Sequence, residues 1–162
     1  MAMVWQTELF PTASEAEIRR TKFLLSKYKS MRMLMDDFER YEADLRQVAV
    51  DGEVSRRIDD EDLHADKTAN AAVLAEKQRW VYQQYRFYTS QLQRAAGLIQ
   101  DGEARRAIDY RYIQGFSFKE TVLFFRQSLS DSTVRRKLAE GTESVANTLK
   151  LFGFFEHDEV EF

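Results

Sequence analysis

Apolar and polar positions follow a helical rhythm along most of the chain. A first apolar stripe recurs every three or four residues and consists of Leu24, Tyr28, Met31, Met35, Phe38 and Leu45, with Glu42 as its interruption. A second stripe has the same spacing and consists of Leu74, Val81, Tyr85, Tyr88, Leu92, Ala95 and Ile99, with Gln78 as its polar gap. This spacing is typical of long helices that pack along a seam. We therefore expect one helix over residues 14–50 and a second over residues 67–99.

Local signals predict where the two long helices begin and end. Ser14 and Glu17 have the spacing of a capping box, which starts a helix. The pair Asp51 and Gly52 should end the first helix, and the acidic residues 59–66, with His64 among them, should form a solvated connector. A metal site would need more convergent ligands than one His and a few acids, so we expect no metal and no other cofactor.

The two stripes offer more apolar surface than one antiparallel helix pair needs. Trp80 and Phe87 lie beside the second stripe and widen it further. We therefore expect a homo-oligomer, with a dimer favoured. The residues expected at its interface are Leu24, Tyr28, Met31, Met35, Phe38, Leu74, Val81, Tyr85, Tyr88 and Leu92.

The C-terminal third has the pattern of a helix-turn-helix. Ser117 with Glu120 forms a capping box, and Ser130 offers a second helix start after a long turn at residues 126–129. The inward positions of the second helix are Val134, Leu138, Val145, Leu149 and Phe152, and those of the first are Phe118, Val122 and Phe125. A supporting helix over residues 103–113 should precede the pair, with Ile108, Tyr112 and Ile113 turned inward. Gly141 lies inside the second helix, at a cost of about 1 kcal/mol relative to Ala.

Basic and hydroxyl side chains cluster near the start of the second helix. A helix fits the major groove of DNA, and Arg, Lys, Ser and Thr donate hydrogen bonds to bases and phosphates. We expect Ser130, Ser132, Thr133, Arg135 and Arg136 to face bases or nearby phosphates. We expect Lys119, Arg126 and Lys137 to contact the backbone of double-stranded DNA. The competing interpretation is an ordinary helical pair with a solvated basic face.

Three segments of the C-terminal third are similar to a known family. They are RYIQG at residues 111–115, SDSTVRRKL at 130–138 and VANTL at 145–149. They resemble phage late-gene transcriptional regulators of the autolysin-regulator (ArpU-like) family, whose DNA-binding half is similar to region 4 of sigma factors. LLSKY at residues 24–28 looks like the N-terminal helix of that family. The resemblance implies a sequence-specific regulator of phage transcription in a bacterial host cell, with host RNA polymerase as a further partner.

Composition narrows the class of protein. The 162 residues include no Cys, one Pro and six Gly, which excludes disulfides and thiolate chemistry and suits a reducing cytoplasm. No apolar run approaches the roughly 20 residues that span a bilayer, and no signal peptide pattern opens the chain, so we expect a soluble cytoplasmic protein without a membrane partner. Nothing resembles a catalytic triad, a phosphate-binding glycine loop or a His cluster, so we expect no enzyme.

The net charge of −3 conceals a segregation along the chain. Residues 1–102 carry 15 basic and 17 acidic side chains, residues 103–150 carry 9 and 6, and residues 151–162 carry 4 acidic ones only. The single net-positive block is thus the one with the helix-turn-helix pattern. Local charge matters most, because the Debye length at physiological salt is about 8 Å.

These observations predict an all-α protein in three parts. Residues 1–100 form a helical packing and oligomerisation region, residues 101–152 a helix-turn-helix DNA-binding domain, and residues 153–162 an acidic aromatic tail that finishes the core or engages a partner. The expected function is sequence-specific transcriptional regulation of phage late genes. The alternatives are a small terminase-type phage DNA-packaging protein and a helical protein-protein adaptor that does not bind DNA.

Overall fold

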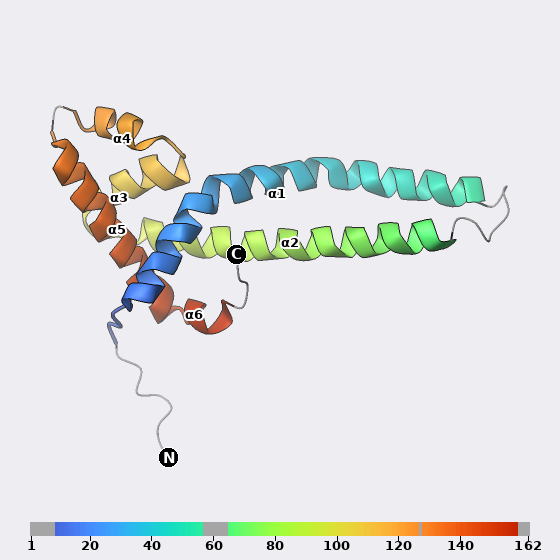
Figure 1. Ribbon diagram of the computed structural model, residues 1–162, viewed down its shortest axis with the longest axis horizontal. Helices are drawn as coiled ribbons and strands as arrows, with labels where there is room; N and C mark the ends of the chain where they lie inside the picture. Colours follow the sequence, from blue (N-terminus) through green and yellow to red (C-terminus); the bar gives the residue numbers. More distant parts are fainter. Residues whose placement is uncertain (1–8, 57–64, 127, 159–162) are drawn as a thin grey trace, which may run out of the picture. The chain divides into compact units, whose positions relative to one another are not determined.

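A computed structural model describes residues 9–56, 65–126 and 128–158, and for residues 43–56 and 65–71 it describes the backbone alone. The described residues fold into helices, without a strand (Figure 1). In chain order these are α1 (Glu15–Arg56), α2 (Ala65–Gly97), α3 (Gly102–Ile108), the π-helical turn η1 (Asp109–Ile113), α4 (Phe118–Phe124), α5 (Asp131–Leu151) and α6 (Phe154–His157). The expected all-α class with two long N-terminal helices is confirmed.

The start of α1 agrees with its sequence signal, and its end does not. The backbone N–H of Ser14 donates to Glu17 Oε1 at 2.8 Å, and the N–H of Glu17 donates to Ser14 Oγ at 3.2 Å, which is the expected capping box. The expected break at Asp51 and Gly52 is wrong, because α1 continues to Arg56. One Gly inside a helix costs only about 1 kcal/mol relative to Ala, too little to end a helix whose other residues favour it.

The chain forms two compact units, and the long helices take part in both. Unit 1 comprises Met1–Lys29 and Tyr88–Phe162, and unit 2 comprises Ser30–Phe87. The expected boundary after residue 100 therefore differs from the division of the structure, which cuts across α1 and α2. The segment expected to form the helix-turn-helix shares its unit with the first turns of α1 and the last turns of α2.

The core of unit 1 is built from one face of each helix. Of the expected inward residues, Val134, Leu138, Val145 and Leu149 of α5 are buried, and so is Gly141, whereas Phe152 at the C-cap is half-buried. The other helices and the segments beside them also supply core residues, and the largest fully buried side chains outside α5 are Leu24, Leu25, Tyr88, Leu92, Ile99, Ile108 and Phe154. The last turn of α5 also anchors the start of α1: Asn147 Oδ1 accepts the N–H of Ala13 at 2.7 Å, and Lys150 Nζ lies 3.0 Å from Glu17 Oε1.

A polar network connects Asp158, the C-cap of α6, to both long helices within unit 1. The Arg20 guanidinium of α1 makes two hydrogen bonds of 2.8 Å to the carboxylate of Asp158, and the Tyr88 hydroxyl of α2 donates to the same carboxylate at 2.7 Å. Phe154 of α6 packs edge-to-face on the Tyr88 ring, with centroids 5.7 Å apart. Burial, together with the Asp158 carboxylate, raises the pKa of Tyr88 to about 12. The expectation that the tail aromatics finish the core holds for Phe154, whereas residues 159–162 lie outside the described part of the chain.

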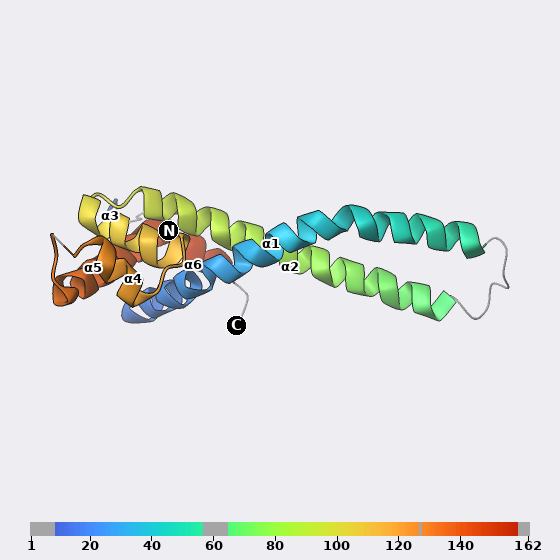
Figure 2. The ribbon, with the colours of Figure 1, turned by 90° about the horizontal axis from the view of Figure 1, so that it is seen from above.

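Unit 2 is a pair of antiparallel helical segments from α1 and α2, which lie side by side in both views (Figures 1 and 2). The rings of Phe38 and Tyr82 stack between the two segments, with their centroids 4.7 Å apart, and the Tyr82 hydroxyl donates to Glu39 Oε1 at 2.6 Å. Met31 and Met35 are buried. The expected acidic connector lies at residues 59–66, most of which are outside the described residues.

The structure divides the residues expected at a dimer interface into two groups. Leu24, Tyr28, Met31, Met35, Tyr88 and Leu92 are at most 4% exposed, so they pack inside a single chain and offer no surface to a second copy. Phe38 and Tyr85 are half-buried, and Leu74 and Val81 are exposed. Only this second group remains available for self-association.

Candidate nucleic-acid interface

The N-terminus of α5 is the expected reading end of the helix-turn-helix, and its local geometry depends on Ser130. This residue is the N-cap, in extended conformation, and its Oγ accepts the backbone N–H of Thr133 at 3.3 Å. The same oxygen lies 2.9 Å from Thr133 Oγ1 and 3.2 Å from Ser132 Oγ. The hydroxyl groups of Ser132 and Thr133 thus both hydrogen-bond to that of Ser130 at the helix start. Ser130 acts in the structure as a cap, and Ser132 remains exposed beside it.

The helix before the turn also begins as its sequence predicts. Ser117 caps α4, with its Oγ accepting the N–H of Glu120 at 3.1 Å and donating to Glu120 Oε1 at 3.0 Å. Of the expected apolar face, Phe125 is buried, whereas Phe118 and Val122 are half-buried.

The connection from α4 to α5 is long because it contains turns of its own. Phe125 is the C-cap of α4, and its carbonyl oxygen accepts the N–H groups of Ser128 and Leu129, both at 2.8 Å. Gln127 lies outside the described residues.

Gly141 permits the close contact between α5 and the supporting helix α3. A Cβ atom at this position would overlap the side chain of Ile108 and lie 3.2 Å from the carbonyl oxygen of Ala104. Ile108 and Ala104 are fully buried. The glycine therefore lets two backbones approach, which explains a residue that sequence reasoning counts only as a helix penalty.

Four of the five expected cations are exposed at this end of unit 1: Lys119, Arg126, Arg135 and Arg136. The Arg135 guanidinium lies over the Phe118 ring at 5.2 Å, so this cation of α5 rests on the first turn of α4. Arg136 is 66% exposed and lies 3.7 Å from Glu140, one turn further along α5. An exposed pair of this kind contributes little and can exchange for a phosphate partner.

The fifth cation, Lys137, has a different position from the one expected. Its ammonium lies 2.5 Å from Asp101 Oδ2 and 3.6 Å from Glu140 Oε2, and its side chain is only 16% exposed. Asp101 is also the N-cap of α3, with its carboxylate accepting the N–H groups of Glu103 and Ala104. The bond from Lys137 lowers the pKa of Asp101, and the same bond raises the pKa of Lys137. Lys137 thus connects α5 to the supporting helix, and a phosphate would have to displace Asp101.

The supporting helix has a feature that its sequence does not reveal. α3 continues into the π-helical turn η1, in which Gln114 donates its N–H to the carbonyl oxygen of Asp109 at 2.8 Å. Gly115 comes next with φ of +78°, a backbone conformation that residues other than glycine rarely adopt. This glycine directs the chain toward α4. The expected inward residues Ile108 and Tyr112 are buried, and Ile113 is half-buried.

Aromatic side chains also gather around α4, where sequence reasoning gave them no role. The Phe124 ring stacks on Tyr110 with centroids 4.5 Å apart, and it lies 5.1 Å from the Phe116 ring. Phe124 is nevertheless 52% exposed, and its neighbour Leu123 is 60% exposed.

The described part of the chain contains no group of three His, Cys, Asp or Glu residues that could hold a metal ion. Within the same residues, no helix is both long and apolar enough to cross a membrane. Comparison of the chain with protein-family models, with curated proteins and with solved structures finds no match.

Proposed function

We propose that the chain is a sequence-specific DNA-binding transcriptional regulator, in which the N-terminal turns of α5 read the major groove. The observation that carries the proposal is the exposure of Arg135 and Arg136 in the second turn of a firmly capped helix. We further propose phage transcription as the process, because the segments at residues 111–115, 130–138 and 145–149 resemble phage late-gene regulators.

The distribution of side chains along α5 supports contact through its first two turns only. Asp131, Ser132, Arg135 and Arg136 are exposed there, so two cations outweigh one carboxylate, whereas the next exposed charged residues on the helix are Glu140 and Glu143. Carboxylates repel phosphates, so the middle of α5 is unsuited to lie near the DNA backbone. Helix-turn-helix proteins use the N-terminal residues of the recognition helix in this way.

The contact between Arg135 and Phe118 suggests that the cations have different roles in DNA binding. A guanidinium held over an aromatic ring loses less freedom on binding than one that moves freely in solvent. Within the described part of the chain Arg136 has no such ring partner, and its exposed guanidinium can leave Glu140 for a base edge. Lys119 and Arg126 come from α4 and the turn after it, from where they contact phosphates.

A DNA titration with purified variants tests the proposal. If Arg136 reads a base edge, Arg136→Ala should cost about 1–3 kcal/mol on the selected site and relax preference at one position. Lys119→Ala, which removes a phosphate contact, should weaken all sequences alike and lower the salt slope by about one unit. The cognate site is obtained first, by selection of bound fragments from phage or host genomes.

Arg19→Ala is the matched control, because Arg19 is an exposed arginine of α1 and not of the proposed interface. It should leave DNA affinity unchanged. If Arg135→Ala combined with Arg136→Ala keeps full affinity in a folded protein, α5 is not the recognition helix. No affinity of the native chain even at low salt would favour the adaptor function, and a ring of many subunits would favour DNA packaging.

A further inference from the structure

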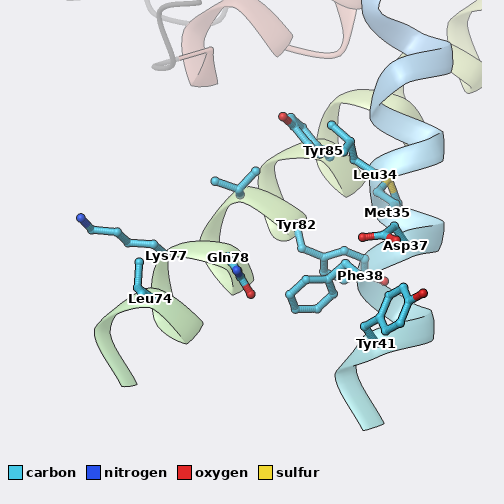
Figure 3. Close-up of a pocket in the computed structure, with 11 residues that line it drawn as sticks. Leu34, Met35, Asp37, Phe38, Tyr41, Leu74, Lys77, Gln78, Tyr82 and Tyr85 are labelled. Atoms are coloured by element: carbon cyan, nitrogen blue, oxygen red, sulfur yellow. The ribbon is translucent and has the colours of Figure 1, made fainter. Parts of the chain in front are cut away.

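The two helical segments of unit 2 leave an open apolar groove along one side. Its volume is about 650 Å³, and its lining includes Leu34, Asp37 and Tyr41, which we call the α1 edge, and Leu74, Lys77 and Val81, which we call the α2 edge. Figure 3 shows the lining side chains on both helices. Leu34 is 52% exposed, Tyr41 49% and Leu74 58%. Large apolar side chains that are this exposed and line a common groove mark an interaction surface.

The hairpin cannot close this groove on itself. The stacked rings of Phe38 and Tyr82 fill the space between the two segments, and the bond from the Tyr82 hydroxyl to Glu39 holds the ring in that place. Figure 3 shows these rings between the helices, with Leu74 and Lys77 projecting from α2. The groove is therefore a preformed feature of the folded hairpin.

The two edges of the groove match in residue spacing and are opposite in charge. Leu34, Asp37 and Tyr41 have the same spacing of three and then four residues as Leu74, Lys77 and Val81. Each edge thus presents an apolar, a charged and an apolar side chain in that order. Residues 34–42 carry four acidic side chains and one basic one, whereas residues 74–86 carry one acidic and three basic ones.

We propose that this groove binds a second copy of the same chain, so that two hairpins form a four-helix bundle. A two-fold axis parallel to the helices lays the acidic edge of each copy along the basic edge of the other. Both seams are then complementary at once, as an interface between identical subunits requires. The alternative two-fold arrangement, with like edges together, would oppose acid to acid. Four-helix bundles with apolar facing positions are a standard solution for such a pair of hairpins.

The mass of the full chain in solution, measured without DNA by sedimentation equilibrium across micromolar concentrations, tests the proposal. We expect twice the 19.1 kDa mass of one chain. Leu34→Glu and Leu74→Glu should each weaken association at least about tenfold, because each places a carboxylate in the apolar seam. Since both residues are more than half exposed in the single chain, helical content should stay unchanged. A chain that stays monomeric throughout overturns the proposal and leaves the groove to another ligand.

Leu98→Glu is the matched control, because Leu98 is 53% exposed and belongs to unit 1. It should leave association unchanged, and a loss equal to that of Leu34→Glu would exclude the groove as the interface. The experiment contains no DNA, so its outcome does not depend on the proposed function.

Cross-linking tests the opposed-edge arrangement. The chain has no cysteine, so Tyr41→Cys and Val81→Cys each place a single thiol on one edge. With a short bismaleimide reagent, a mixture of the two variants should cross-link more than either variant alone. Stronger cross-linking within each separate variant would show that like edges meet, and would overturn this arrangement.

Discussion

Gly141 shows at the scale of one residue how a local cost becomes a tertiary requirement. In an isolated helix, alanine at this position would be favoured by about 1 kcal/mol. In the folded chain, the missing side chain makes room for Ile108 and for the backbone of α3. Tight interiors tolerate added volume poorly, so the tertiary effect is expected to exceed the helix preference.

We expect Gly141→Ala to lower the free energy of unfolding by about 1–3 kcal/mol, since the added methyl group must displace Ile108. Urea unfolding followed by circular dichroism measures the change. Gly97→Ala is the matched control, because a Cβ at Gly97 meets nothing within 4 Å. The control should be neutral or stabilising by up to about 1 kcal/mol. A stable Gly141→Ala protein would mean that α3 and α5 do not approach this closely.

At the scale of elements, α6 is too short to be stable alone and depends on its tertiary contacts. A helix of four residues lies far below the length at which isolated helices persist. Its position is secured by Phe154 in the core and by Asp158, whose carboxylate serves Arg20 of α1 and Tyr88 of α2 together. Asp158 thereby joins three helical segments through one side chain.

Asp158→Ala should destabilise unit 1 by about 1.5–3 kcal/mol, because it removes hydrogen bonds to a charged, partly buried arginine. Amide hydrogen exchange should increase in α6 and in the nearby turns of α1. The pKa of Tyr88 should fall from about 12 toward its ordinary value of 10.0, because the Asp158 carboxylate contributes to the shift. Glu156→Ala, at an exposed position of the same helix, should change none of these quantities. Unchanged exchange in α6 would contradict the role of Asp158.

At the scale of the whole molecule, the hairpin Ser30–Phe87 is inserted in the sequence between the two parts of unit 1. Among the described residues, the buried hydrophobic side chains other than Met31 and Met35 all belong to unit 1. The two ends of the hairpin are also near each other, since the Tyr28 hydroxyl lies 3.4 Å from Gln93 Oε1. Unit 1 should therefore fold without unit 2.

Replacing residues 30–87 by a short glycine-serine linker should leave a cooperatively folded, monomeric unit 1, because most of the buried hydrophobic side chains among the described residues belong to it. The same protein should keep the DNA affinity of one copy and lose self-association. Urea unfolding, sedimentation and the DNA titration measure these three properties. An unfolded product would show that unit 1 needs the hairpin, and a dimeric product would place the interface outside the groove.

The sequence alone determined the all-α class, most helix starts and the buried face of α5. Ser14, Ser117 and Ser130 cap helices as predicted, because a capping bond forms between residues three apart and needs no tertiary partner. Val134 and Leu138 are buried as their spacing predicts, because helical periodicity places them on one side. The predicted end of α1 was wrong, since the cost of Gly52 is small beside the sum of its neighbours' preferences.

Only the tertiary structure decided which side chains have partners and which apolar residues remain exposed. The sequence predicts Lys137 as a phosphate contact, but in the fold its ammonium binds Asp101, which lies 36 positions earlier. The sequence places Asp158 in an acidic tail, but in the fold its carboxylate binds Arg20, which lies 138 positions away. Leu24 and Leu74 belong to stripes of the same rhythm, yet one is fully buried and the other 58% exposed. Periodicity specifies the face of a helix, whereas burial and pairing depend on residues that only the fold brings together.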